Sequence, residues 1–479
     1  MKNFVPHIEA KSLLSQLDCL TFVMSLLLIS ALPLLFDKRR KKNQSKEAHS
    51  KASYLVTGRK ITMPFFVASL VSTWYGGVFG VTRISFEQGV YHFLSQGLFW
   101  HLSYLIFVLF VVDQVFKYPQ ARSLAHLVEL IFGKGAARTC ALLNLLNVLP
   151  TVYMISLGSF LFAIFGVSVS FWMTLSTVII ASYTSIGGFR AVVVSDFYQF
   201  VAMMFALLSV LFFSFIYVGS PIELVENLPS SHLDPLGGES FWQLLIWGFI
   251  ALTTLVDPNF YQRCLASPSP RFAKRGILYS IIFWVLIDLC TCLSGLYAKW
   301  VIPSASAQTA YLIYSLQILP EGLRGIFCSG MVAMVVSTTD SYLFTAGQVL
   351  SQDLLGASGI KWQRISILLI AASTLLLASQ LEGNIKEVWK FFGSLSSACL
   401  FIPVMIGFIK KDLLDAYTFQ ASCYASMTTL FVWKFIVPLS VSHFIDPFYL
   451  GASVSLVICL KPRKFSMNPV KILMKLGNN

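Results

Sequence analysis

Long, continuous runs of apolar residues repeat along almost the whole chain, and they constrain its fold more than any other feature. A helix needs about 20 apolar residues to cross roughly 30 Å of hydrocarbon, and thirteen runs meet or approach that length. Their approximate limits are 17–36, 64–91, 94–117, 138–165, 167–183, 188–218, 241–263, 275–300, 322–350, 363–380, 388–409, 417–438 and 445–460. The sequence therefore predicts an all-α integral membrane protein with about 13 transmembrane helices.

The composition excludes several other classes of protein. Charged residues make up 12% of the 479 residues and hydrophobic residues 56%, whereas about a quarter of a soluble chain is charged. Because this much apolar surface exceeds what one core can bury, the remainder must face lipid. A cytosolic enzyme, a secreted disulfide module and a disordered chain are excluded. The nine cysteines are scattered without CxxC pairs, so no disulfide framework or metal cluster is indicated.

The basic residues are distributed unevenly among the segments between the runs. Two basic runs dominate, DKRRKK at 37–42 and KPRK at 461–464, whereas the loop 219–240 has four acidic residues and no Lys or Arg. The positive-inside rule then places the N-terminus outside and the C-terminus inside a plasma membrane, which we expect to be a bacterial cytoplasmic membrane. The net charge of +13 is accordingly a signal of topology, and no nucleic-acid partner is expected.

Two of the runs contain residues that interrupt a helix at membrane depth. The run 64–91 contains SerThrTrpTyrGlyGly at 72–77, and the run 241–263 contains Asp257 followed by Pro258. Non-helical backbone is tolerated at this depth only beside protein or a watery cavity. Interrupted spans five apart are typical of inverted-repeat transporters, whose site lies at the midplane. Gly and Pro are also common in ordinary transmembrane helices, so this pattern alone leaves both interpretations open.

Three segments resemble the sodium:solute symporter family. YTSIGGFRA (Tyr183–Ala191) is similar to the signature of that family, and Gly322–Leu354 resembles its ninth span, with a SerThr-x-AspSer core. DPNFYQRCLAS (Asp257–Ser267) resembles the segment that leaves the seventh span. The likeness covers roughly residues 50–410. It implies a LeuT-like 5+5 inverted-repeat core, with broken first and sixth core helices, that moves a small solute inward with sodium.

The order of the spans and this resemblance together predict the domain organisation. The chain 1–479 is expected to be a single membrane domain, and its first run is too long for a signal peptide. The expected parts are a peripheral N-terminal span at 17–36, a first five-helix repeat at 64–218, a second at 241–409 and two peripheral C-terminal spans at 417–460.

A sodium site is predicted where the ninth span faces the break in the second. Sodium prefers several oxygen ligands, and Ser337 and Thr338 supply two hydroxyls on adjacent positions. The Met334 carbonyl lies one turn below them on the helix. The remaining ligands are expected to be carbonyls freed around Ser72 and Tyr75. In the alternative interpretation, the two hydroxyls bond back to carbonyls of their own helix.

Acidic residues in the spans are functional candidates by default. The resemblance suggests that Asp196 lies on the inner ion route, and the alternative is a solvated helix cap. Asp340 is expected to pair with a neighbouring helix, whereas Asp113 and Asp288 receive no predicted role. Some family members carry an acidic residue in the broken second span and this chain has none there, which leaves coupling to sodium or to protons open.

The solute is expected where the two broken spans meet. The predicted lining residues are Trp74, Gly76, Gly77, Tyr153, Trp247, Thr253, Thr254 and Asp257. Freed amides there can take a carboxylate, and aromatic rings can cover an apolar body. Ordinary helix packing is the alternative for each aromatic residue. Family members place aromatic residues in the seventh span where this chain has Ile250 and Thr254, so a proline-type pocket does not carry over.

These features predict a secondary active transporter that imports a small organic solute with sodium by alternating access. The solute classes considered are an amino acid, an organic acid, a sugar acid and a vitamin. No Walker loop or nucleophile motif is present, so the chain is not expected to be an enzyme. Sodium is the only expected cofactor, with no organic cofactor and no other metal. A proton-coupled symporter of the same fold, a membrane solute sensor and a channel are the alternatives.

Overall fold

The computed structural model describes residues 9–41, 61–357, 359–381, 385–410, 413–437 and 446–461, and the regular secondary structure of these residues is helical. Eight of these helices are long and apolar enough to cross a membrane, and three shorter apolar helices accompany them. Each predicted run contains helix, in agreement with an all-α membrane fold, whereas the total of about 13 crossings stays a prediction. Within the basic runs at 37–42 and 461–464, residue 42 and residues 462–464 fall outside the described residues.

The helices of the first half of the chain lead from the N-terminal element to a long connection. They are η1 (Ala10–Leu13), α1 (Gln16–Lys41), α3 (Met63–Ser72), α4 (Val78–Gln88), η4 (Phe93–Leu98), α5 (Phe99–Ile106), η5 (Phe107–Val111), α6 (Val112–Phe116), α7 (Leu124–Phe132), α8 (Lys134–Asn147), α9 (Thr151–Phe165), α10 (Val169–Tyr217), α11 (Pro221–Asn227) and α12 (Ser230–Leu233).

The second half continues from this connection to the last described helix. Its elements are α13 (Phe241–Ala251), η6 (Leu252–Val256), α14 (Pro258–Ala266), α15 (Pro270–Val301), α16 (Ala310–Ile318), α17 (Leu323–Gln348), η7 (Val349–Leu354), α18 (Ile360–Gln380), α19 (Ile385–Ser396), η8 (Ser397–Phe401), α20 (Ile402–Ile409), α21 (Ala416–Phe435) and α23 (Pro447–Leu460). The short helices α7, α11, α12 and α16 lie in segments expected to be connections.

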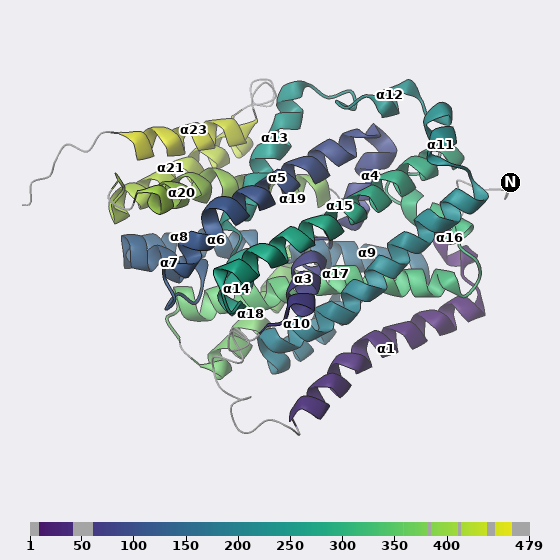
Figure 1. The fold of residues 1–479 in the computed structure, drawn as a ribbon, viewed down its shortest axis with the longest axis horizontal. Coiled ribbons are helices and arrows are strands. Elements are labelled where there is room, and N and C mark those ends of the chain that lie inside the picture. The colour runs from purple at the N-terminus through teal and green to yellow at the C-terminus, as the bar shows by residue number, and fades with distance from the viewer. Residues whose placement is uncertain are drawn as a thin grey trace, which may run out of the picture.

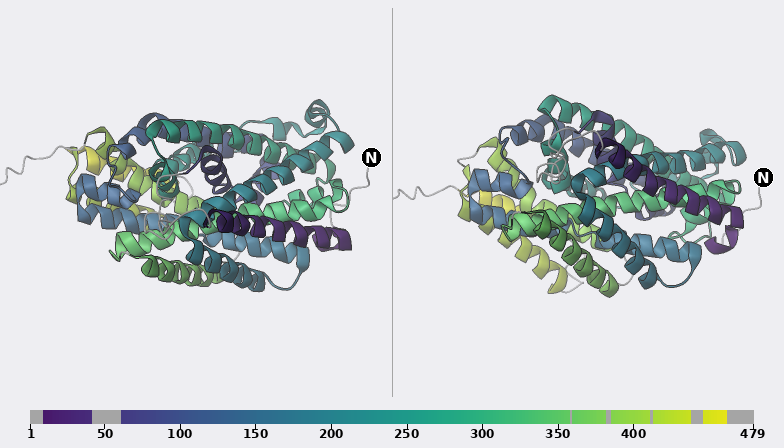
Figure 2. Two further views of the ribbon diagram at one scale, coloured as in Figure 1. Left: turned by 60° about the horizontal axis from the view of Figure 1, so that its bottom comes forward. Right: turned by 90° about the horizontal axis from the view of Figure 1, so that it is seen from below.

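The short helix α3 lies inside the bundle, packed against α10, α15 and α17 (Figures 1 and 2). It begins with Pro64 in its first turn, where the missing N–H costs nothing. It ends at Ser72, and α4 begins only at Val78. The segment 73–77 between them is therefore non-helical backbone in the middle of the protein, surrounded by other helices instead of lipid.

A second interruption separates α13 from α14. The α-helix tightens to a 3₁₀ turn at Leu252–Val256, and Asp257 is extended, with φ −78° and ψ 119°. Pro258 cannot donate to the preceding turn, so it opens a new helix. The Asp257 side chain caps that helix by accepting a hydrogen bond from the Asn259 amide at 2.7 Å.

The longest helix, α10, includes two of the predicted runs, 167–183 and 188–218, with one kink between them. Residues 184–187, which we expected to be a connection, are helical instead. The helix is interrupted at Gly188, whose φ of 68° and ψ of −170° suit a residue without a Cβ. Because one glycine provides the whole change of direction, no loop is needed.

Peripheral elements pack around this core. α1 lies along one side of the bundle against α10 and α17 (Figures 1 and 2). It is fixed by polar contacts as well as by apolar packing: the Gly322 amide donates to Asp18 Oδ1 at 2.6 Å, and Thr21 Oγ1 donates to the Gly322 carbonyl at 2.7 Å. The helices α21 and α23 pack on each other at the opposite end of the chain.

Candidate functional site

The end of α3 meets the middle of α17 through hydroxyl and carbonyl oxygens. Thr338 Oγ1 lies 3.2 Å from the Ser72 carbonyl and 3.2 Å from the Met334 carbonyl. Ser337 Oγ lies 2.7 Å from Ser72 Oγ. All four residues are fully buried. Four of the five predicted sodium ligands are thus brought together, and Thr338 satisfies the alternative of a back-bond to its own helix at the same time.

Gly76 makes this approach possible. A Cβ on Gly76 would lie 2.7 Å from Thr338 Cβ and 2.7 Å from Tyr153 Cδ1, far inside van der Waals contact. The backbone of the break therefore packs directly on side chains of α17 and α9. The predicted residues Gly76, Tyr153 and Thr338 belong to one contact.

Tyr75, the fifth predicted sodium ligand, makes its recorded contacts elsewhere. Its carbonyl accepts a hydrogen bond from the Val78 amide at 3.1 Å, as α4 begins. Its phenol donates to Asp288 Oδ1 on α15. The carbonyl keeps a second lone pair, so its participation in an ion site stays a prediction.

Asp196 on α10 lies beside the Ser337 and Thr338 pair in a buried polar network. Ser337 Oγ donates to Asp196 Oδ1 at 2.5 Å, and Ser69 Oγ on α3 donates to Asp196 Oδ2 at 2.6 Å. The Asp196 side chain is completely buried. The alternative prediction of a solvated helix cap is therefore wrong, because Asp196 lies inside α10 and is enclosed by α3 and α17.

Arg263 on α14 supplies the counter-charge that the sequence interpretation missed. Its Nη2 lies 3.7 Å from Asp196 Oδ2. The same nitrogen lies 3.0 Å from Ser69 Oγ, 2.6 Å from Thr73 Oγ1 and 2.9 Å from Ser341 Oγ. A fully buried arginine needs such a partner. The sequence could have indicated this pair, because Arg263 lies within the predicted span 241–263 and a cation inside a span needs an acidic partner.

Two further acidic residues have structural partners. Tyr183, in the YTSIGGFRA segment, donates from its phenol to Asp340 Oδ2 at 2.5 Å and so joins α10 to α17. This is the pairing with a neighbouring helix that we expected for Asp340. Asp113 forms a half-exposed ion pair with Lys274 Nζ at 2.7 Å, so it lies outside the polar network around Arg263.

A cavity lies beside the two helix breaks. Its lining contains four of the predicted solute contacts, Trp74, Tyr153, Thr253 and Asp257. The other lining residues are Trp100, Asn147, Leu149, Val152, Ile250, Tyr342, Phe392 and Gly393. Sequence reasoning missed these because aromatic and apolar residues are common in every span. Trp247 and Thr254 are buried but belong to neither this lining nor that of the neighbouring cavity.

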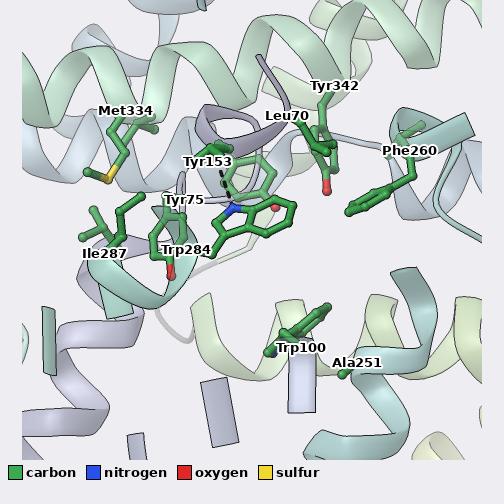
Figure 3. Close-up of a cluster of buried hydrophobic side chains, with 14 of the residues drawn as sticks. Leu70, Tyr75, Trp100, Tyr153, Ala251, Phe260, Trp284, Ile287, Met334 and Tyr342 are labelled. Carbon is green, nitrogen blue, oxygen red and sulfur yellow. Dashed lines mark hydrogen bonds between the residues drawn. The ribbon is translucent and has the colours of Figure 1, made fainter. Parts of the chain in front are cut away.

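A second cavity adjoins the first at Trp74. It is lined by Trp74, Tyr75, Gly77, Val81, Gln96, Trp100, His101, Tyr104, Trp284 and Asp288. In Figure 3, Trp100 lies opposite Tyr75 and Trp284. Gly77, a predicted solute contact, lies here rather than in the first cavity, and Trp74 and Trp100 belong to both.

A helical membrane bundle with two interrupted helices, a buried hydroxyl–carbonyl cluster and cavities beside the breaks has the architecture of a membrane carrier. The profile of the sodium:solute symporter family matches residues 54–411. The chain belongs to that family, and the resemblance read from the sequence is confirmed.

Named relatives and a solved structure agree with this assignment. The chain is 25% identical over 306 residues to the sodium/pantothenate symporter of Haemophilus influenzae. This match covers 59% of this chain and 60% of the relative. The chain is 24% identical over 344 residues to sodium-coupled monocarboxylate transporter 2 of Mus musculus, covering 66% of this chain and 54% of the relative. The matches thus span about half to two thirds of these relatives. Both are named as transporters, in agreement with the expectation that the chain is not an enzyme.

The fold is shared with a solved Na⁺-coupled sialic acid symporter in a substrate-bound, outward-open state. The TM-score is 0.77 at 13% identity, over 93% of this chain and 96% of that one. At this identity the likeness concerns the fold alone.

Proposed function

We propose that the chain imports a small organic solute together with sodium by alternating access. In this proposal the pairs α3–α4 and α13–α14 are the broken first and sixth helices of a LeuT-like core, with repeats at 64–218 and 241–409. The single observation that carries it is the convergence of Ser72, Met334, Ser337 and Thr338 at the point where α3 ends.

The donor set suits sodium. Two neutral carbonyls and two hydroxyls keep lone pairs that are free to bind a cation, and a hard monovalent ion prefers such oxygens. The carboxylate of Asp196 accepts from Ser337 and lies next to this cluster. We propose that this carboxylate forms the inner route of the ion, with Arg263 balancing its charge when the ion is absent.

Sodium is sufficient as a driving ion. One charge moving down ~100 mV releases roughly 2.3 kcal/mol, and a tenfold ion gradient adds about 1.4 kcal/mol. Together these could sustain about 500-fold accumulation of a neutral solute per coupled ion. The solute itself, an amino acid, organic acid, sugar acid or vitamin, is proposed to bind beside the two breaks. It would occupy the cavity lined by Trp74, Tyr153, Thr253 and Asp257 together with the second cavity, which shares Trp74 and Trp100 with it.

The sodium site is tested on the double variant Ser337→Ala, Thr338→Ala. The measurement is the thermal unfolding of the purified protein in sodium chloride titrated against potassium chloride at constant ionic strength. Wild type is expected to be stabilised by sodium, because a ligand that binds only the folded state raises its stability. The double variant is expected to need at least tenfold more sodium for the same shift.

Thr339→Ala is the matched control, because the Thr339 hydroxyl bonds back to the Val335 carbonyl at 2.8 Å on the same helix. It is expected to respond to sodium as wild type does. An unchanged sodium response in the double variant would remove the proposed site. A stabilisation that follows pH and ignores sodium would favour the proton-coupled alternative.

A further inference from the structure

The second cavity, which is lined in part by Asp288 and His101, contains an acidic residue that is not part of the proposed sodium site. Asp288 lies on α15 and is 2% exposed. Its Oδ1 accepts from the Tyr75 phenol, and its Oδ2 lies 2.9 Å from His101 Nε2. Gly97 allows the helix that carries His101 to come close, since a Cβ there would be 3.1 Å from Asp288 Oδ2.

The same cavity contains polar atoms without partners. Both amide atoms of Gln96 and the indole nitrogen of Trp74 are buried and form no hydrogen bond with the part of the chain that the structure describes. Gln96 is 7% exposed and lies on the π-helical turn η4, a type of turn that is frequent at functional sites. Since buried polar groups are nearly always hydrogen-bonded, these atoms point to a ligand.

Asp288 is the acidic residue in the lining of this cavity. Among the described residues, no Lys or Arg belongs to the lining of this cavity or of its neighbour. The Asp257 carboxylate of the neighbouring cavity is already compensated by the N-terminus of α14. Asp288 lies inside the long helix α15 and has no helix end to offset its charge. His101 Nε2 lies 2.9 Å from Asp288 Oδ2 but forms no hydrogen bond with the described part of the chain, and a neutral imidazole carries no charge to offset that of the carboxylate.

Aromatic rings enclose the rest of the cavity. Trp74 lies 5.5 Å from Trp100 between ring centroids, and Tyr104 stacks on Trp284 at 4.0 Å. Tryptophan and tyrosine faces attract cations, and they recognise ammonium groups when they are assembled around an acid. A carboxylate in this space would instead face Asp288, with no lysine or arginine in the lining to pair with it.

From these observations we infer that the cavity binds the ammonium group of an alkylammonium solute, with Asp288 as counter-ion, Trp74, Trp100 and Trp284 as its aromatic walls, and Gln96 as a hydrogen-bonding partner for the rest of the solute. The inference rests on the proposed function for transport, but binding at the cavity is measured without it. It separates this chain from relatives named for pantothenate and monocarboxylates.

The test compares cations with uncharged molecules of the same shape. Choline is paired with 3,3-dimethylbutan-1-ol and ethanolamine with propan-1-ol, each titrated into the purified full chain while thermal unfolding is followed. At least one cation is expected to bind at least tenfold more tightly than its uncharged partner. If neither cation binds more tightly than its partner, or if pyruvate binds in preference to both, the inference is overturned.

Variants assign the binding to the cavity. Asp288→Asn is expected to weaken binding of the preferred cation at least tenfold, whereas Asp113→Asn, which removes the surface acid paired with Lys274, is expected to leave it unchanged. Trp100→Leu keeps the acid and removes one aromatic wall, so it provides a second variant if Asp288→Asn does not fold. Wild-type affinity in a well-folded Asp288→Asn or Trp100→Leu protein would overturn the assignment.

The two proposals fail independently. If the preferred cation stabilises wild type but sodium does not, the proposal of sodium symport is overturned and the proposal of an ammonium-binding cavity is supported. If sodium stabilises wild type while the cations and their uncharged partners bind equally, the proposal of sodium symport is supported and the proposal of an alkylammonium solute is overturned.

Discussion

At the scale of single residues, the absence of a side chain at Gly76 sets how closely the broken helix approaches α17. The contact places the non-helical segment directly on Thr338 and Tyr153, and it brings the Ser72 carbonyl within 3.2 Å of the Thr338 hydroxyl. A larger residue would have to push these elements apart, because neighbouring side chains are close-packed.

Gly76→Ala is therefore expected to destabilise the protein by about 1–3 kcal/mol through overpacking and to weaken the sodium-dependent stabilisation. The measurement is thermal unfolding with and without sodium. Gly80→Ala is the control, because a Cβ at Gly80 meets no atom within 4 Å. A Gly76→Ala protein that responds to sodium like the control would show that close contact at this position does not shape the ion site.

At the scale of elements, the kink of α10 positions Asp196. Tyr183 lies before Gly188 and donates to Asp340 on α17. Asp196 lies after Gly188 and contacts Ser69 and Ser337. The kink lets one continuous helix present both polar residues to α17. Gly188 occupies a backbone region that is essentially restricted to glycine.

We expect Gly188→Ala to cost about 1–3 kcal/mol, the strain of holding an alanine in this conformation. The thermal unfolding midpoint of the purified protein should fall, while Gly80→Ala at an open helical position should leave it unchanged or raise it slightly. Equal midpoints for the two variants would mean that the kink can relax at no cost, and the proposed role of the glycine would be withdrawn.

At the scale of the whole molecule, the basic residues predict orientation. The segment that contains α11 and α12 has acidic residues and no Lys or Arg, whereas several connections on the alternate side are basic. Under the positive-inside rule, the segment that contains α11 and α12 is expected to face outward. The orientation of the termini therefore bears on the proposed direction of transport.

Cysteine labelling checks this orientation in a Cys19→Ser background, since Cys19 is exposed and the other eight cysteines are buried. Both Glu226 on α11 and Lys361 on α18 are exposed. A membrane-impermeant maleimide is expected to label Glu226→Cys in intact cells and Lys361→Cys only after permeabilisation. The reverse pattern would place the N-terminus inside.

The sequence by itself determined the membrane fold class, because apolar length and charge asymmetry are properties of each segment alone. It also located both helix breaks, since Gly76, Gly77 and Pro258 act on the local backbone. The residues Ser337 and Thr338 could be named from the family resemblance, and the structure places them beside Ser72.

Only the tertiary structure decided which polar residues meet. Arg263 and Asp196 are 67 positions apart in the chain, and Asp288 reaches Tyr75 and His101 from a different helix. Which face of a helix meets which neighbour depends on how several helices pack at once, and no local pattern contains that information. The cavities follow from the same packing, because the aromatic residues that line them look like ordinary span residues in the sequence.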